Sequence, residues 1–423
     1  MTASKNTDQE ARPASAANAR SPTIRGRQPP QTPTIRRVQR LLSLDDFEAA
    51  AAKHLPRPIF GYVAGAAETN WSHDDNRAAF GEFGFIPRVL VDVSQRSQQT
   101  SLFGRIYAVP FGIAPLGISA LYAYRGDIVL ARAAAAANIP MILSGSSLIR
   151  LEEVAQAGQT AWFQAYLPDD APRITALIER VARAGFRTLV ITVDVPVWAN
   201  RENNLRAGFA TPLRPTLRLA WDGVTHPQWL LGTFLRTLTR HGMPHFENNY
   251  ATRGAPILSA SVAREFSDRG TLNWEHFALV RRLWTGQLVI KGILHRDDAR
   301  IARDAGADGI IVSNHGGRQL DGAVSPLRVL PEIVATCPDI PVMMDSGVRR
   351  GTDVLKALAL GAKFVFVGRP FAYAAAIGGE PGVGHAIGLL SDEIFRDMAM
   401  LGITDLDKLS LSQLVRVKGH SPE

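Results

Sequence analysis

Gly-Ile-Ile-Val-Ser-Asn-His-Gly-Gly-Arg-Gln-Leu-Asp-Gly, residues 309–322, joins an apolar run to a loop that is rich in polar groups. The run from Gly309 to Val312 has the continuity of a parallel strand that is buried on both faces. The loop leaves the carboxyl end of this strand, where parallel α/β proteins carry their chemistry. His315 can move a proton near neutral pH, and Arg318 can hold a carboxylate through two parallel hydrogen bonds. Either residue alone would more often be an ordinary solvated group at the end of a strand. Whether the pair is functional therefore depends on the rest of the sequence.

The same alternation of apolar run, polar turn and helix extends to both sides of this stretch. Eight apolar runs are typical of buried strands: Pro110 to Pro115, Pro140 to Leu143, Ala161 to Tyr166, Thr188 to Val193, Leu288 to Ile290, Gly309 to Val312, Val342 to Met344 and Phe364 to Val367. Helical segments lie between them: Asp127 to Asn138, Arg173 to Ala184, Trp274 to Trp284, Arg296 to Ala305 and Val354 to Leu360. Eight parallel strands with helical crossovers predict an α/β fold, a closed (β/α)8 TIM barrel. A doubly wound open sheet is the alternative, but no Gly-x-Gly-x-x-Gly opens a helix after the first strand.

Additional segments precede and interrupt the repeat. Leu44 to His54 and Phe60 to Glu68 are expected to form a helical cover, and residues 85–107 a short antiparallel hairpin. About 90 residues separate the fourth and fifth runs, so residues 203–271 are an insertion after strand 4. We therefore expect one barrel domain over residues 43–423, preceded by a separate tail over residues 1–42.

The insertion contains one amphipathic segment. On a helix, Trp229, Leu230, Phe234 and Leu238 lie near one face, and Arg236, Arg240 and His241 form a basic rim. Such a segment could lie in a membrane interface, cover the active site or pack on a neighbouring subunit.

Composition and charge bound the functional classes. The single cysteine, Cys337, excludes an intrachain disulfide and suits a reducing compartment. Residues 1–42 carry eight basic and two acidic groups, so they hold most of the net charge of +8 and the barrel is nearly neutral. This tail is rich in Pro, Ala, Ser and Thr, and we expect it to be disordered, with an anionic membrane surface a better partner than nucleic acid. No uncharged apolar run of about 18 residues occurs, so we expect a cytoplasmic protein, either free or at the inner face of the membrane.

The nine residues Ser313 to Asp321 resemble the signature of the FMN-dependent 2-hydroxy-acid oxidases and dehydrogenases, the family of glycolate oxidase, lactate oxidase and mandelate dehydrogenase. The resemblance extends from about residue 44 to about residue 405. It implies an FMN cofactor, no metal, and oxidation of an L-2-hydroxy acid to a 2-oxo acid. A homotetramer is the assembly that it suggests.

The resemblance also assigns the substrate residues. His315 takes a proton from the substrate, and Asp194 orients this histidine and stabilises the imidazolium. Arg318 and Arg201 bind the substrate carboxylate with Tyr62, and a further tyrosine, Tyr166, contacts the substrate hydroxyl.

The cofactor residues implied by the resemblance are spread over successive strand ends. Lys291 places a positive charge near N1 and O2 of the flavin, where charge develops on reduction. Asp345 holds ribityl hydroxyls, while Arg349 and Arg369 neutralise the phosphate, as expected for the phosphate site after strands seven and eight. The remaining contacts are expected from Ala114, Pro115, Leu116, Gly117, Ser144, Gln164, Thr192, Ser313, Ser346, Gly347 and Gly368.

The resulting hypothesis is an FMN-dependent L-2-hydroxy-acid dehydrogenase or oxidase for a lactate- or mandelate-like acid. Electrons would pass to a quinone, a cytochrome or oxygen. An FMN-dependent maturase acting on a peptide-borne or larger group is the alternative enzyme, since Leu116 replaces the usual threonine and Ser146 leaves room. A non-catalytic barrel that binds a membrane or partner is the alternative outside enzymes, and its purified form would lack flavin.

Overall fold

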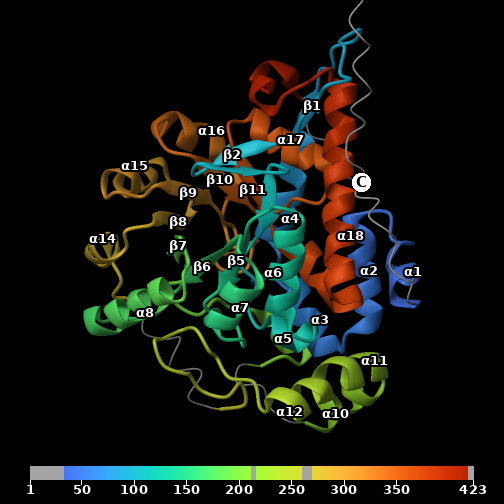
Figure 1. The fold of residues 1–423 in the computed structure, drawn as a ribbon, viewed down its shortest axis with the longest axis vertical. Coiled ribbons are helices and arrows are strands. Elements are labelled where there is room, and N and C mark those ends of the chain that lie inside the picture. Colours follow the sequence, from blue (N-terminus) through green and yellow to red (C-terminus); the bar gives the residue numbers. More distant parts are fainter. Residues whose placement is uncertain (1–32, 211–215, 260–268, 418–423) are drawn as a thin grey trace, which may run out of the picture.

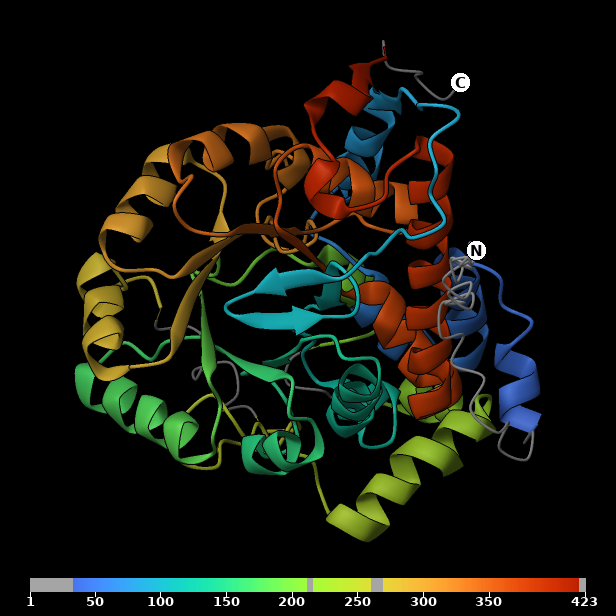
Figure 2. The ribbon, with the colours of Figure 1, turned by 45° about the horizontal axis from the view of Figure 1, so that its top comes forward.

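A closed parallel barrel forms the centre of the computed structural model, which describes residues 33–210, 216–259 and 269–417. Within these ranges eight strands close the barrel in the order β10, β11, β4, β5, β6, β7, β8, β9 (Figures 1 and 2). Their bounds are β4 (Phe111–Ile113), β5 (Met141–Ser144), β6 (Ala161–Ala165), β7 (Thr188–Thr192), β8 (Gln287–Ile293), β9 (Gly309–Val312), β10 (Val342–Asp345) and β11 (Phe364–Val367). Each strand coincides with one of the eight apolar runs, so the predicted TIM barrel is confirmed.

A ring of helices surrounds the barrel, one preceding or following each strand. They are α6 (Gly126–Ala136), α7 (Leu151–Ala157), α8 (Ala171–Arg183), α14 (Trp274–Leu283), α15 (Arg296–Asp304), α16 (Pro326–Thr336), α17 (Gly351–Ala359) and α18 (Arg369–Leu401). The strands are almost wholly buried because side chains fill the barrel inside and the helices cover it outside. This double burial explains why the strands appear in the sequence as unbroken apolar runs.

A hairpin of β2 (Thr100–Leu102) and β3 (Arg105–Tyr107) lies across one end of the barrel (Figure 2). Its residues Leu102 and Tyr107 are buried in the same cluster as the inward-facing Trp162, Phe364 and Phe366 of the barrel strands. The hairpin therefore closes the end of the barrel opposite the carboxyl ends of the strands. The predicted hairpin region began too early: β1 (Phe83–Phe85) pairs instead with β12 (Leu414–Arg416) near the end of the chain.

The helical cover consists of α2 (Leu44–His54), α3 (Arg57–Ala64) and α4 (Trp71–Ala78), as the sequence predicted for its first two segments. Most of the basic tail lies outside the described residues. Its last part corrects the predicted boundary at residue 42, because residues 33–38 form a helix, α1 (Pro33–Val38). Val38 is buried against Gly378 of α18, and the Leu41 carbonyl accepts a hydrogen bond from His385 Nε2 at 2.9 Å. The contacts of Val38 and Leu41 therefore dock this end of the tail on α18.

The insertion forms helices that lie outside the barrel, at the bottom of Figure 1. They are α9 (Glu202–Ala207), α10 (Leu217–Val224), α11 (Pro227–Trp229), the π-helical η2 (Leu230–Leu235) and α12 (Arg236–His241), and the last three are continuous. The predicted apolar face packs on the barrel: Trp229 is buried and its Nε1 donates to the Leu121 carbonyl at 2.7 Å. Phe234 stacks on Trp229 with ring centroids 5.5 Å apart. The apolar face that contains Trp229 and Phe234 therefore packs against the rest of the same chain.

Candidate active site

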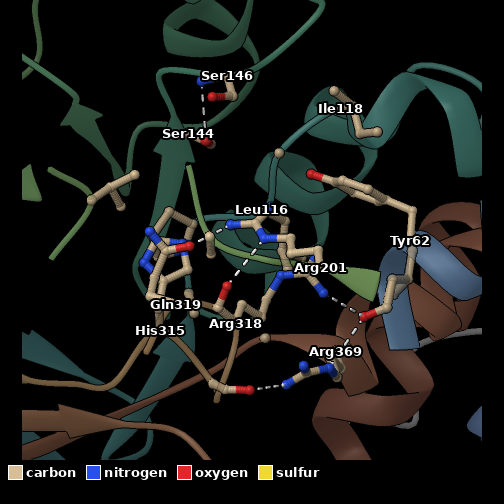
Figure 3. A pocket seen from close by; sticks show the side chains of 18 of the residues that line it. Tyr62, Leu116, Ile118, Ser144, Ser146, Arg201, His315, Arg318, Gln319 and Arg369 are labelled. Atoms are coloured by element: carbon tan, nitrogen blue, oxygen red, sulfur yellow. Dashed lines mark hydrogen bonds between the residues drawn. The ribbon is translucent and has the colours of Figure 1, made fainter. Parts of the chain in front are cut away.

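A cavity of about 500 Å³ opens at the carboxyl ends of the barrel strands. All five residues predicted to bind substrate line it: Tyr62, Tyr166, Arg201, His315 and Arg318. Figure 3 shows the side chains of Tyr62, Arg201, His315 and Arg318, which come from the helical cover, from the loop after β7 and from the loop after β9. Tyr166 directly follows β6. Residues that are up to 256 positions apart in the sequence, such as Tyr62 and Arg318, are brought together because the carboxyl ends of all strands meet here.

His315 forms a buried pair with Asp194, which follows β7. The distance from His315 Nδ1 to Asp194 Oδ1 is 2.9 Å. Burial lowers the pKa of His315 below its usual range; Asp194 acts to raise it, while Lys291 and Arg201 lower it further. Burial would raise the pKa of Asp194, but the adjacent imidazole and Lys291 bring it below its usual value. The pair is therefore suited to a neutral imidazole that can accept a proton beside an ionised carboxylate.

Two arginines face the cavity next to this pair. Arg201 Nε donates to the Arg318 carbonyl at 3.1 Å, and Arg318 Nη1 donates to the Gly65 carbonyl at 2.6 Å. The guanidinium of Arg318 lies over the Tyr62 ring, 5.0 Å from its centroid. Burial, and then the neighbouring Arg318, lowers the pKa of Arg201 to about 10. Two half-buried cations held by neutral carbonyls form a site that a carboxylate would neutralise.

Two tyrosines line the same cavity. Tyr166 Oη lies 3.5 Å from His315 Nε2, at the limit of hydrogen bonding, and burial followed by the charge of Asp194 raises its pKa. Tyr62 contacts the Phe209 ring, with centroids 4.8 Å apart. The Tyr166 hydroxyl therefore stays protonated near neutral pH, and both hydroxyls can donate hydrogen bonds to substrate oxygens.

The catalytic loop is held by the helical cover. Asp321 accepts hydrogen bonds from the backbone nitrogens of Thr69 at 2.9 Å and Ser72 at 3.0 Å, and from the Thr69 hydroxyl. Behind the loop, Asn76 and Asn314 exchange two amide hydrogen bonds of 2.8 and 2.7 Å. Gly317 has a φ of +71°, and a Cβ there would lie 2.5 Å from the backbone nitrogen of residue 73, so this position requires glycine.

Lys291 is the central cation on the cofactor side. Its Nζ lies 2.9 Å from Asp345 Oδ2 and donates to Ser313 Oγ at 2.6 Å. Lys291 pairs with Thr192 across β7 and β8, and Ser144 pairs with Gln164 across β5 and β6. The expected residues thus form a ladder across neighbouring strand ends.

Two atoms of this ladder remain without a hydrogen-bond partner among the described residues. They are Gln164 Nε2 and Thr192 Oγ1, although both side chains are buried. Gln164 Oε1 accepts from the Gly145 nitrogen at 3.2 Å, so its amide group is oriented. Buried polar atoms normally have a partner, and a heterocycle with several nitrogens and oxygens would supply one.

Two buried arginines mark the phosphate end of the cavity. Arg369 donates only to carbonyls in the described part of the chain: Val63 at 3.1 Å, Gly316 at 3.0 Å and Gly65 at 2.9 Å. Burial, and then Arg318, lowers its pKa to about 9. Burial also lowers the pKa of Arg349, whose nearest carboxylate, Asp45, is 3.8 Å away. A phosphate would neutralise both groups, so the residues present fit FMN.

Most of the residues predicted to bind the cofactor line the cavity. They are Ala114, Pro115, Leu116, Gly117, Ser144, Lys291, Asp345, Ser346, Gly347, Arg349, Gly368 and Arg369. Gln164, Thr192 and Ser313 lie behind this wall, next to Ser144 and Lys291. Asp194 likewise lies behind His315, as a residue that orients the histidine would.

Sequence reasoning missed the wall opposite the cofactor residues. Its members are mainly apolar and come from the loop after β7 and the insertion: Val195, Trp198, Leu205, Phe209, Phe246 and Ile257. Arg269 adds a guanidinium that lies 4.5 Å from the centroid of the Tyr166 ring. No local pattern marks these residues, because their place depends on how the insertion folds back over the barrel. Gln319 was also missed, although it stands inside the signature.

Comparisons with known proteins agree with this arrangement. A sequence profile of the FMN-dependent dehydrogenase family matches residues 51–416. The chain is 38% identical over 375 residues to (S)-mandelate dehydrogenase of Pseudomonas putida, covering 88% of this chain and 93% of that protein. It is 39% identical over 379 residues to L-lactate dehydrogenase of Pseudomonas entomophila, covering 88% of this chain and 98% of the relative.

Solved structures give the same result. The crystal structure of the monotopic membrane protein (S)-mandelate dehydrogenase has a TM-score of 0.82 and 37% identity, with coverage of 89% of this chain and 100% of the other. A mandelate oxidase with (S)-2-phenylpropionate has a TM-score of 0.73 and 36% identity, with 90% and 99% covered.

Proposed function

Because this chain belongs to the FMN-dependent dehydrogenase family, whose relatives oxidise 2-hydroxy acids, we propose that it converts an L-2-hydroxy acid with an aromatic side chain to the 2-oxo acid. One observation carries this proposal. A histidine–carboxylate pair and two half-buried arginines lie at one cavity, part of whose lining fits FMN. A proton acceptor, a carboxylate clamp and a redox cofactor are the three parts that the reaction requires.

The residues divide the chemistry between them. Oxidation of the C–OH group to C=O removes two protons and two electrons from the substrate. Arg318 and Arg201 bind the carboxylate and so place the hydroxyl carbon beside His315. His315, neutral because burial lowers its pKa, accepts one proton, and Asp194 stabilises the imidazolium that forms. When bound, FMN accepts the two electrons with the second proton.

The apolar wall supports an aromatic substrate. Phe209 and Ile257 are buried, and Leu205 lies beside them at the rim of the cavity. Burying an aromatic ring against such a wall contributes roughly 1.5–3 kcal/mol, a gain that the methyl group of lactate cannot match. The similarity to (S)-mandelate dehydrogenase points the same way.

Flavin reduction in the absence of oxygen tests the reaction and its substrate class. The holoenzyme is mixed with (S)-mandelate, (R)-mandelate, L-lactate or glycolate, and the flavin absorbance is followed. We expect (S)-mandelate to bleach the flavin with the highest rate constant divided by Kd. Faster bleaching by lactate would contradict the aromatic assignment, and a flavin that no small acid bleaches would favour the maturase alternative.

A carrier such as a quinone is the electron acceptor that we propose. The relatives reported above include dehydrogenases and a membrane protein, which supports a carrier over oxygen. Admitting air to the bleached enzyme should restore colour slowly, whereas a soluble quinone should restore it quickly. Rapid recolouring in air would identify an oxidase.

We also propose contact with a membrane surface through the insertion. None of the described helices is long and apolar enough to span a bilayer. The exposed large apolar residues on the outer helices of the insertion, from α10 to α12, are Leu217, Trp221 and Val224 on α10 and Leu231 and Leu235 on η2. Those on α10 share one face by their spacing, and Arg236 and Arg240 lie next to the others, as in an interfacial helix.

Vesicle binding tests this contact. The variant Trp221→Glu/Leu231→Glu should lose binding to vesicles that contain anionic lipid. Trp71→Glu is the matched control, because Trp71 is 52% exposed on α4, outside the insertion. Equal binding of both variants would contradict the proposed surface. The homo-oligomeric state stays a prediction that light scattering can check.

A further inference from the structure

We propose that Gln319 is a positioning residue, which fixes the guanidinium of Arg201 relative to the His315–Asp194 pair. This inference rests on the function proposed above, because it concerns how the carboxylate clamp is aligned with the proton acceptor. It assigns to the loop after β9 a third task, in addition to supplying His315 and Arg318.

The contacts of the Gln319 amide carry the proposal (Figure 3). Its Oε1 accepts a hydrogen bond from Arg201 Nη2 at 2.6 Å. Its Nε2 donates to the Asp194 carbonyl at 3.3 Å. Asp194 in turn orients His315 through the 2.9 Å contact of their side chains. A single amide group therefore connects the carboxylate clamp with the residue that holds the base.

These contacts determine which nitrogen of the Arg201 guanidinium is available to a ligand in the cavity. Arg201 Nε is occupied by the Arg318 carbonyl at 3.1 Å and Nη2 by Gln319. In the described part of the chain, Nη1 makes no hydrogen bond. Because the guanidinium is planar, fixing Nε and Nη2 also fixes the direction of Nη1. Nη1 is therefore the atom that is left for a substrate carboxylate in the cavity.

The neutrality of Gln319 is as important as its reach. Arg201 is held here by two uncharged oxygens, so its positive charge is not cancelled before the substrate arrives. A carboxylate at position 319 would keep the acceptor but neutralise Arg201 and place a second negative charge beside Asp194. An apolar side chain of the same length would remove both contacts and leave Arg201 free to rotate. Only a neutral amide combines an acceptor for Arg201 with a donor for Asp194.

Two variants of the holoenzyme separate these effects, with anaerobic stopped-flow reduction by (S)-mandelate as the assay. Gln319→Met keeps the shape, and we expect Kd to rise about 10- to 100-fold, because the alignment of a charge-assisted hydrogen bond is lost. Gln319→Glu should raise Kd at least about tenfold by neutralising Arg201. Gln319→Glu should also move the acid limb of the pH profile to higher pH, since an added carboxylate raises the pKa of His315. This shift of the limb reports the added charge, whereas the rise in Kd reports the loss of Arg201 as a free cation.

A double-mutant cycle tests whether Gln319 acts through Arg201. In an Arg201→Met background, Gln319→Met should change Kd by less than about twofold, because the group that it positions is absent. Leu320→Ala is the control, since this side chain is 72% exposed on the same loop. It should retain the wild-type constants. Flavin content and melting temperature show whether each variant folds.

The outcomes are distinguishable. Gln319 variants with wild-type Kd and pH profile would overturn the inference while the proposed function stands, and so would a full Gln319→Met effect in the Arg201→Met background. If Gln319→Met fails to fold or to bind flavin, Gln319→Glu decides alone, and an unchanged Kd and acid limb overturn the inference. A wild-type flavin that no 2-hydroxy acid reduces would remove the proposed function, and this inference with it.

Discussion

Replacing Asp194 with asparagine should slow flavin reduction without removing the flavin. The substitution keeps an oxygen near His315 Nδ1, now 2.9 Å from Asp194 Oδ1, and removes the negative charge. A carboxylate and an imidazolium about 4 Å apart interact by roughly 4 kcal/mol at an effective dielectric constant of about 20. Since asparagine can still accept a hydrogen bond, we expect a loss of about 2–4 kcal/mol in the transition state. This corresponds to a rate that is about 30- to 1,000-fold lower.

The pH profile of the Asp194→Asn variant provides an independent test, because the direction in which its acid limb moves can be predicted. Asp194 raises the pKa of His315 against burial, Lys291 and Arg201, so its removal should lower that pKa further. The reaction needs neutral His315, and the acid limb of kcat/KM should therefore move to lower pH while the plateau falls. Asp297→Asn is the control, because Asp297 faces His295 at 3.8 Å with both side chains more than half exposed. A plateau within threefold of wild type, or a limb at higher pH, would refute the reasoning.

Three further substitutions test other parts of the site. Lys291→Met should leave the buried Asp345 unpaired and cost about 3–5 kcal/mol, seen as a lower melting temperature and loss of flavin on gel filtration; a stable yellow variant would contradict this. Phe209→Leu should reduce the preference for (S)-mandelate over L-lactate by about 2- to 10-fold in kcat/KM, since an aromatic contact is worth about 0.5–1.5 kcal/mol. Gly117→Ala would place a Cβ 3.0 Å from Tyr62 Oη, so KM should rise by about 2- to 10-fold as that hydroxyl is displaced, and an unchanged KM would exclude Tyr62 from carboxylate binding.

The sequence predicted the barrel well because each strand is buried on both faces. Gly309 to Val312 and Phe364 to Val367 are strands with the predicted bounds, since a parallel strand between core and helices must be apolar throughout. The site residues at the strand ends were implied by the family resemblance, and the strand register explains why they are neighbours. Thr192 and Lys291, for example, are neighbours because β7 and β8 pair in parallel.

The orientation of the insertion could not be predicted in this way. Apolar residues lie on two sides of the helix from α11 to α12, and the sequence marked Trp229 and Phe234 without telling whether they face the barrel or solvent. The centre of the buried face is polar, since Thr233 and Thr237 are buried and the Thr237 hydroxyl donates to the Thr233 carbonyl at 2.7 Å. A threonine satisfied by its own helix gives no signal of burial in the sequence. The apolar wall of the cavity was missed because its place depends on how the insertion folds back over the barrel.

The pairing of Gln319 with Arg201 illustrates a different limit. The signature places Gln319 one residue after Arg318, but its partner, Arg201, is 118 positions away in the loop after β7. Only the closed barrel, which brings the ends of β7 and β9 together, makes this contact possible. Residue identity was therefore visible in the sequence, whereas the role depends on tertiary structure.

The most direct test of the central claim is anaerobic mixing of the His315→Gln variant with (S)-mandelate. Glutamine can fill the space of the imidazole but cannot accept the proton at neutral pH. We expect a yellow protein with wild-type flavin content whose absorbance does not decline, while the wild type bleaches within the same time. A His315→Gln variant that bleaches at a rate close to that of the wild type would contradict the role of this histidine.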